Sequence, residues 1–341
     1  MIGLNKNDND RLKYLAFCDL AGMELKPEVI KRIEQLEQKY NAMGQDLISY
    51  LDGLLHADFL TYWDYIHADT LLSLQTPKTS FPDEQIFIMY HQITELYFKL
   101  CLHEFEQLSS QQKPEVGFMI ARLNRINSYF ENLVRSFEIM VDGMEQQQFL
   151  KFRMSLLPAS GFQSGQYRMI EICATDFIHL VGKDYRHKFN QESSVEEMFE
   201  FIYWKAGATE LASGKKTLTL KQFEEKYSAQ LIKLANNKKQ SNIHALYHLL
   251  PQTDQENPKL INALKMLDVN VNVNWPLSHY KSAVRYLQKD PEDIKATGGT
   301  NWQKYLPPRF QNRIFFPELW NKNEIQEWGK SWVIELFDKT S

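Results

Sequence analysis

The stretch DEQIFIMYHQITELYFKLCLHEF, residues 83–105, repeats apolar side chains every three or four positions and carries them on more than one face. That spacing is the period of an α-helix, whereas a half-buried strand alternates every two residues. A helix that is apolar most of the way round is normally enclosed by other helices. We therefore predict that the segment from Pro82-Asp83 through Leu108 is the central helix of a bundle.

The same helical spacing continues along most of the chain. Only 14 glycines and 12 prolines interrupt the 341 residues, and alternating strand-like runs are scarce. Asp83 and Ser194 precede two helical segments, where side chains of these types often cap a helix. We expect an all-α protein with a helical N-terminal extension at 1–57 and a main helical domain at 58–341. Further stripes cover 27–55, 116–140, 163–180, 195–206, 220–234, 242–250, 258–267, 276–288 and 323–337.

Composition restricts the classes of partner and the compartment. A formal charge of −4 and a pI near 6.2 argue against nucleic acid, which requires a basic surface. Cys18, Cys101 and Cys173 lie far apart, as is typical of free thiols in a reducing compartment. The N-terminus lacks the apolar core of a secretory signal, and apolar runs stay well below the roughly 18 residues of a membrane span. We expect a soluble, cytoplasmic protein.

A turn rich in proline, serine and glycine, PASGFQSGQYR at 158–168, follows Phe152 and Arg153. It places Arg153 and Arg168 among aromatic residues. A guanidinium group in such surroundings needs an anion or another hydrogen-bond acceptor. Two alternatives stay open on these residues alone: structural salt bridges, or an arginine that binds an anionic ligand.

Histidines offer two further hypotheses. His91 lies in the central helix and His279 in the amphipathic segment 275–285. Each fits a core histidine satisfied by a hydrogen bond. Together they also permit a haem site, in which one imidazole ligates the iron and the other faces the ligand pocket. His244 and His248, four residues apart on a predicted helix, could face one zinc ion, but a third ligand with convincing spacing does not follow.

Other catalytic motifs are missing or weak. The sequence contains neither a Gly-x-Ser-x-Gly elbow, nor a P-loop, nor a Gly-x-Gly-x-x-Gly motif, so hydrolase, NTPase and dinucleotide-binding functions lack support. The turn TGGT at 297–300 could bring backbone amides and hydroxyls close to a ligand, although a simple helix-ending turn explains it equally well.

Taken in order, these segments resemble the tryptophan 2,3-dioxygenase family. The resemblance extends over roughly residues 58–310 and is specific because five motifs occur in the family's order. They are TYWDYI with LLSLQ at 61–75, DEQIFIMYHQITELYFK at 83–99, Phe152-Arg153 with the turn at 158–168, LSH at 277–279, and TGGT at 297–300.

The resemblance implies an all-α haem b enzyme of tryptophan catabolism, the kynurenine pathway. Such enzymes insert both atoms of O2 across the indole C2–C3 bond of L-tryptophan, giving N-formyl-L-kynurenine. They typically form homotetramers in which an N-terminal segment completes a neighbour's pocket. His279 matches the proximal iron ligand, and His91 matches the catalytic distal histidine that contacts the indole N–H.

The remaining site residues are likewise implied by the resemblance. Arg153 matches the arginine that pairs with the substrate carboxylate, which suits a bidentate guanidinium. Phe87 matches an aromatic wall against the indole. The others are Thr297 at the amino-acid head group, Tyr62 and Tyr65 contributed by a neighbouring subunit, and Ser160 and Gly161 in a turn near the haem and its propionates.

Two departures from the family pattern are visible. Phe149 stands where the family commonly has a tyrosine whose hydroxyl also reaches the substrate carboxylate. Glu138 stands where a tryptophan is often found. Losing one neutral hydrogen bond costs about 0.5–1.5 kcal/mol of binding. Two alternatives therefore remain: a related haem enzyme that oxidises a modified tryptophan or another indole, and a non-catalytic haem-binding protein.

Overall fold

The computed structural model describes residues 25–58, 60–111, 115–156, 163–190, 192–208, 215–287 and 307–329. Most of these residues are helical, and β pairing among them is confined to one bridge between Val181 and Ile202. The predicted all-α class is confirmed. Backbone contacts divide the chain into a first unit, residues 1–74, and a second unit, residues 75–341. The extension at 1–57 stays a prediction.

The first unit contains helices that are mostly exposed. The predicted stripe at 27–55 is divided in two, because Gly44 adopts a positive φ of 67° between α2 and α3. Asp46 then caps α3 by accepting hydrogen bonds from the backbone N–H groups of Ile48 and Ser49. The helices among its described residues are α2 (Pro27–Ala42), α3 (Leu47–Leu55), α4 (Tyr62–Tyr65) and α5 (Ala68–Leu72).

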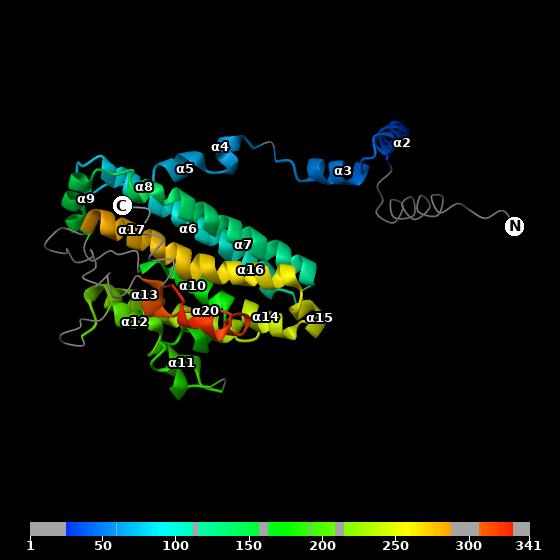
Figure 1. Ribbon diagram of the computed structural model, residues 1–341. Coiled ribbons are helices and arrows are strands. Elements are labelled where there is room, and N and C mark those ends of the chain that lie inside the picture. The colour runs from blue at the N-terminus through cyan, green and yellow to red at the C-terminus, as the bar shows by residue number, and fades with distance from the viewer. Residues whose placement is uncertain are drawn as a thin grey trace. The chain divides into compact units, whose positions relative to one another are not determined.

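The second unit is built around α6 (Asp83–Ser109), which confirms the predicted central helix. It packs against α7 (Val116–Ser136) and α10 (Gly165–Ala174) (Figure 1). The expected cap at Asp83 is wrong, since its carboxylate accepts from the backbone N–H of Glu145 at 2.6 Å and so ties two segments together. The cap at Ser194 is confirmed by its 3.2 Å hydrogen bond from Glu197 N.

One long helix replaces the separate stripes predicted at 258–267 and 276–288. Its two α-helical parts, α16 (Pro258–Val269) and α17 (Trp275–Leu287), are joined by the π-helical turn η5 (Asn270–Asn274). The wider turn ends two residues before Pro276, which lacks the N–H needed for an ordinary α-helical bond. Because proline usually ends a helix, the sequence pattern alone suggested a break here. α16 and α17 both pack against α7 (Figure 1).

Shorter elements surround these long helices and complete a core rich in aromatic side chains, including the fully buried Phe98, Phe105 and Trp204. Cys101 and Cys173 are buried free thiols. In the part of the chain that the structure describes, helices long and apolar enough to cross a bilayer are absent. The remaining described elements are α8 (Glu138–Val141), α9 (Gln146–Phe152), η1 (Arg153–Leu156), η3 (Phe177–Leu180), η4 (Arg186–Lys188), α11 (Val195–Phe199), α12 (Tyr203–Gly207), α13 (Leu218–Lys238), α14 (Ile243–Leu249), α15 (Gln252–Gln255), α19 (Pro308–Gln311), η6 (Pro317–Leu319) and α20 (Lys322–Gln326).

Candidate functional site

The central helix α6 places Phe87 and His91 one turn apart on the same face. His91 Nδ1 lies 2.7 Å from the carbonyl oxygen of Phe87, and the two rings have centroids 4.1 Å apart. A carbonyl can only accept, so Nδ1 carries the proton and Nε2 keeps its lone pair. Burial lowers the pKa of His91 below the ordinary 6.5, which keeps the imidazole neutral at pH 7.

Helix α17 holds His279 in the same way. His279 Nδ1 donates to the carbonyl oxygen of Trp275 at 3.1 Å, so Nε2 again keeps its lone pair. The ring packs against Phe137 and Trp275, each with its centroid 4.5 Å away. Burial, with a smaller contribution from the charge of His91, lowers the pKa of His279 to about 4. The two histidines are therefore electrostatic neighbours in dry surroundings.

We call Phe87, His91, Phe137, Trp275 and His279 the aromatic histidine region. Its chemistry suits a cofactor metal, because a ligating histidine is normally neutral and donates its other N–H to a carbonyl or carboxylate. His279 meets both conditions and can present Nε2 to iron. His91 can offer Nε2 as a hydrogen-bond acceptor to a ligand N–H. The aromatic walls exclude water and provide a surface for a flat, apolar ligand.

Helix α9 adds two more aromatic side chains to this region. Phe149 and Phe152 have ring centroids 6.4 and 5.7 Å from that of Phe87. Arg153 follows at the start of η1, with only 4% of its surface exposed, and burial lowers the pKa of its guanidinium. The structure thus brings Phe87, His91, Phe149 and the Phe152-Arg153 pair to one part of the second unit, with a buried cation beside an aromatic surface.

Arg168, the other arginine of this sequence segment, lies in a buried polar network. Its Nη1 donates to both carboxylate oxygens of Glu171, at 3.0 and 3.1 Å, and to the hydroxyl of Tyr203 at 2.7 Å. Arg313 pairs with the same carboxylate from a distant segment. For Arg168, the structural alternative is therefore the correct one.

The other predicted site residues lie elsewhere or outside the described residues. Tyr62 and Tyr65 lie on α4 of the first unit, and each is 74% exposed. Ser160, Gly161 and Thr297 fall outside the residues that the structure describes. Glu138, one of the two departures, forms an ion pair at 2.6 Å with Lys281 of α17.

Sequence reasoning missed three aromatic residues of this part of the molecule. Trp275 and Tyr286 stand four residues before and seven after His279, so helical spacing could have placed them on its face. Tyr286 packs on Phe149 with centroids 4.7 Å apart, and its hydroxyl donates to the carbonyl oxygen of Met144 at 3.0 Å. Phe137 reaches His279 from the junction between α7 and α8, which local spacing does not reveal.

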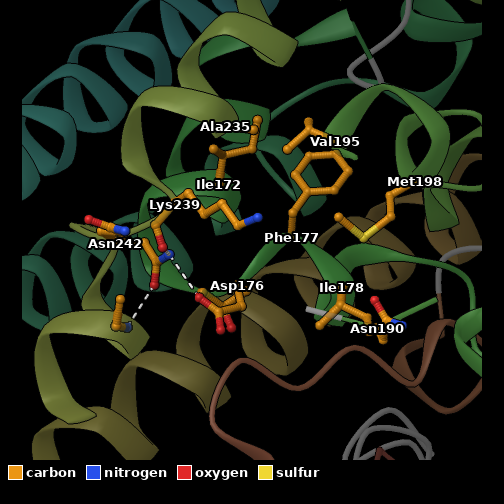
Figure 2. Close-up of a pocket in the computed structure, with 13 residues that line it drawn as sticks. Ile172, Asp176, Phe177, Ile178, Asn190, Val195, Met198, Ala235, Lys239 and Asn242 are labelled. Carbon is orange, nitrogen blue, oxygen red and sulfur yellow. Dashed lines mark hydrogen bonds between the residues drawn. The ribbon is translucent and has the colours of Figure 1, made fainter. Parts of the chain in front are cut away.

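A separate cavity of about 240 Å³ lies among α10, η3, α11, α13 and α14 (Figure 2). Its lining combines apolar side chains such as Phe177 and Met198 with polar groups that include Asp176, Lys239 and Asn242. None of the site residues predicted from the sequence lines it. The aromatic histidine region and this cavity are therefore distinct places in the second unit.

Comparison with known proteins gives a consistent result. A model of the family "Tryptophan 2,3-dioxygenase" matches residues 54–205. A tryptophan 2,3-dioxygenase of Bacillus thuringiensis subsp. konkukian (strain 97-27) is 29% identical over 294 residues, covering 78% of this chain and 94% of the relative. The tryptophan 2,3-dioxygenase of Ruegeria sp. (strain TM1040) is 43% identical over 119 residues, which cover 34% of this chain and 41% of that protein.

Proposed function

We propose that this chain, whose sequence is similar to tryptophan 2,3-dioxygenases, cleaves the indole C2–C3 bond of L-tryptophan with O2 to give N-formyl-L-kynurenine. In this reaction each of the two carbons gains one oxygen atom, and an external reductant is not consumed. The observation that carries the proposal is the pair of half-buried, neutral histidines, each with Nδ1 bonded to its own helix and Nε2 left as a lone-pair nitrogen.

Haem b is the cofactor that this pair fits. His279 would hold the iron through Nε2, because its Nδ1–H is already bonded to Trp275 and its depressed pKa keeps the ring neutral. Bound haem would supply a ferrous iron that binds and activates O2. We assign Ser160 and Gly161 to the turn beside the haem edge on the resemblance alone.

The chain's own residues would bind and orient the substrate. His91 Nε2 accepts the indole N–H, while Phe87 and Phe149 pack against the ring. Arg153 binds the carboxylate with two parallel N–H donors, and Thr297 is assigned to the amino-acid head group. Fixing both ends of the substrate orients C2 and C3 toward the oxygen-binding side, and the aromatic walls keep water out.

We also propose that the enzyme is a homo-oligomer, most simply a tetramer, in which Tyr62 and Tyr65 complete a neighbouring subunit's pocket. The support is their exposure in a segment with other exposed apolar side chains, Leu60, Trp63 and Leu72. Apolar patches of this kind usually mark an interface. Size-exclusion chromatography with light scattering should give a mass above one chain, and a monomer would contradict this assembly.

Phe149 favours one second candidate, oxidation of a modified tryptophan. The position lacks a hydroxyl, and Tyr286 does not replace it because its own hydroxyl donates to Met144. Steady-state rates of ferrous, haem-loaded enzyme with L-tryptophan and with ring- and side-chain-methylated tryptophans distinguish the two. We expect L-tryptophan to have the highest kcat/KM and to give N-formyl-L-kynurenine. A methylated tryptophan turned over at least tenfold better would favour the second candidate.

A further inference from the structure

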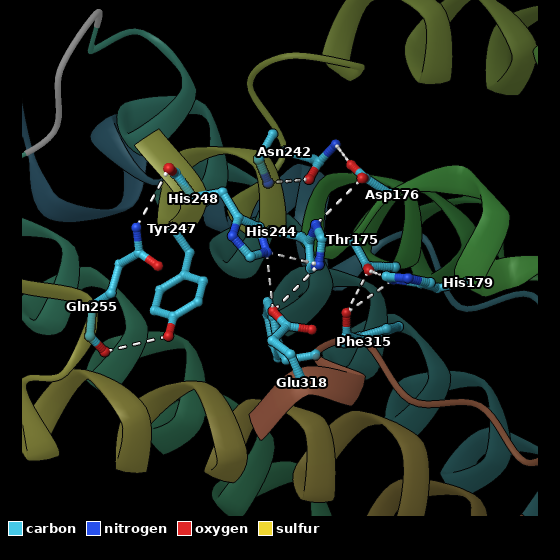
Figure 3. Close-up of polar contacts among 12 residues, drawn as sticks. Thr175, Asp176, His179, Asn242, His244, Tyr247, His248, Gln255, Phe315 and Glu318 are labelled. Carbon is cyan, nitrogen blue, oxygen red and sulfur yellow. Dashed lines mark hydrogen bonds and ion pairs between the residues drawn. The ribbon is translucent and has the colours of Figure 1, made fainter. Parts of the chain in front are cut away.

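A second group of histidines lies far from the aromatic histidine region in sequence and differs from it in character. Helix α14 presents His244 and His248, four residues apart, on one face, and η6 brings Glu318 against them (Figure 3). Asp176, which also lines the cavity, lies behind His244. We call Asp176, His244, His248 and Glu318 the carboxylate–histidine cluster.

Three ligand atoms of this cluster form a nearly regular triangle. His244 Nε2 lies 3.3 Å from His248 Nε2, and Glu318 Oε1 lies 3.3 Å from each of them. Zinc bonds to nitrogen and oxygen are about 2.0–2.2 Å long, and tetrahedral geometry then separates neighbouring ligands by about 3.3–3.6 Å. The triangle therefore has the size of one face of a zinc tetrahedron. Its spacing matches the metal without any movement of the helices.

The surroundings of His244 match those of a metal ligand. Its Nδ1 lies 3.3 Å from Asp176 Oδ2, which favours the tautomer with Nε2 free to bind a metal. Asp176 is itself held by Asn242, whose Nδ2 donates to Oδ1 at 2.9 Å. A carboxylate behind a ligating histidine orients the ring and makes it more basic. His179 packs on His244, but its Nδ1 lies against Thr175 and Phe315.

Charge and access also suit a divalent ion. Two neutral imidazoles and one carboxylate leave a dication with one positive charge, which the carboxylate of Asp176 offsets. The side chain of His244 is 11% exposed, whereas those of His248 and Glu318 are 48% and 33% exposed, so an ion can enter from solvent. Imidazole ligands favour zinc over calcium or magnesium, which prefer an all-oxygen shell.

We propose that His244, His248 and Glu318 bind one Zn²⁺ ion, with water at the fourth position. The ion joins η6, which carries Glu318, to α14, which carries both histidines. It is separate from the haem chemistry proposed above. The sequence suggested the two histidines but offered no third ligand, because Glu318 comes from a distant segment.

Zinc content of the haem-loaded enzyme tests this site. Protein treated with EDTA, incubated with ZnCl2 and desalted should retain one zinc per chain by elemental analysis, with iron measured in parallel. His248→Ala and Glu318→Gln should each lose most of that zinc and keep their iron. The matched controls His187→Ala and Glu256→Gln, which change an exposed histidine and an exposed glutamate outside the cluster, should keep both metals.

Thermal stability gives an independent readout. Saturating ZnCl2 should raise the Tm of the wild-type enzyme by roughly 5 °C and leave that of Glu318→Gln unchanged. The proposal is overturned if the wild-type enzyme retains no zinc, or if both cluster variants retain as much as the controls. Variants that bind zinc normally would show that the ion is held elsewhere on the surface.

Discussion

The two pairs of histidines in this protein have opposite surroundings. His91 and His279 lie among aromatic rings, and each donates Nδ1–H to a carbonyl of its own helix; burial lowers both pKa values. His244 lies between two carboxylates, which hold its pKa at about 9 despite the burial that opposes them. The same side chain is thus prepared for two kinds of chemistry. Surrounding aromatic rings keep a histidine neutral, so that it can ligate a metal or accept a hydrogen bond. Neighbouring carboxylates instead attract a cation to the histidine, either a proton or a metal ion.

The largest effect that this comparison predicts is the loss of haem from His279→Ala. Removing a hydrogen-bond partner of a metal ligand costs about 10- to 100-fold in affinity, so removing the ligand itself should cost more than about 100-fold. Titration of the apoprotein with haem, followed by the Soret band, measures this. His248→Ala is the matched control from the other pair and should bind haem normally. If His279→Ala keeps the wild-type Soret band, the assignment of His279 as the iron ligand is wrong.

The variant Arg153→Lys tests the buried guanidinium group beside the aromatic histidine region. A hydrogen bond to a charged group contributes about 1.5–3 kcal/mol, so losing the bidentate fork should lower kcat/KM for L-tryptophan roughly 10- to 100-fold. Tryptamine lacks the carboxylate, and its low rate should be similar in both enzymes. An equal loss with tryptamine would instead assign Arg153 a purely structural role.

A smaller loss is expected for His91→Gln, which weakens one acceptor for the indole N–H. The expected fall in kcat/KM is roughly two- to tenfold, in line with a neutral hydrogen bond of about 0.5–1.5 kcal/mol. With 1-methyltryptophan, which has no N–H, wild type and variant should differ little. A full tenfold difference on that substrate would contradict the assigned contact.

The pH profile adds a check on the same residue. The pKa of His91 lies below 6.5, so its acceptor nitrogen is lost to protonation only as the pH falls below that value. The His91-dependent part of kcat/KM should be constant near pH 8 and decline in acid solution with a midpoint below pH 6.5. Comparison of the wild-type pH profile with that of His91→Gln isolates the part of the decline that is due to His91. A midpoint at or above pH 6.5 would contradict the lowered pKa of His91.

The smallest effect concerns the carboxylate–histidine cluster. Removal of zinc by EDTA should lower the Tm of the haem-loaded enzyme by a few degrees and leave kcat for L-tryptophan nearly unchanged. Differential scanning calorimetry and steady-state kinetics on the same sample give both quantities. A collapse of kcat that zinc restores would mean that the two regions are coupled.

Periodicity predicted the central helix and the all-α class, because a helix that is buried on several faces carries a strong pattern. It failed at Gly44, where one residue in the left-handed region ends α2, and at Pro276, where a π turn lets the helix continue. Both depend on local backbone geometry that residue spacing does not express.

The site was predictable to a similar degree. His91 and His279 were identified through the family resemblance, and helical geometry explains why each bonds the carbonyl four residues before it. Phe137 and Glu318 were not identified, since each reaches its histidine from a separate element. Contacts of that kind are set by tertiary packing.

The most direct test of the central claim is the reaction of ferrous, haem-loaded enzyme with L-tryptophan under ¹⁸O2, followed by mass spectrometry of the product. We predict N-formyl-L-kynurenine carrying two ¹⁸O atoms when the product is analysed before its oxygens exchange with water. A product with a single ¹⁸O atom, or unchanged L-tryptophan, would contradict it.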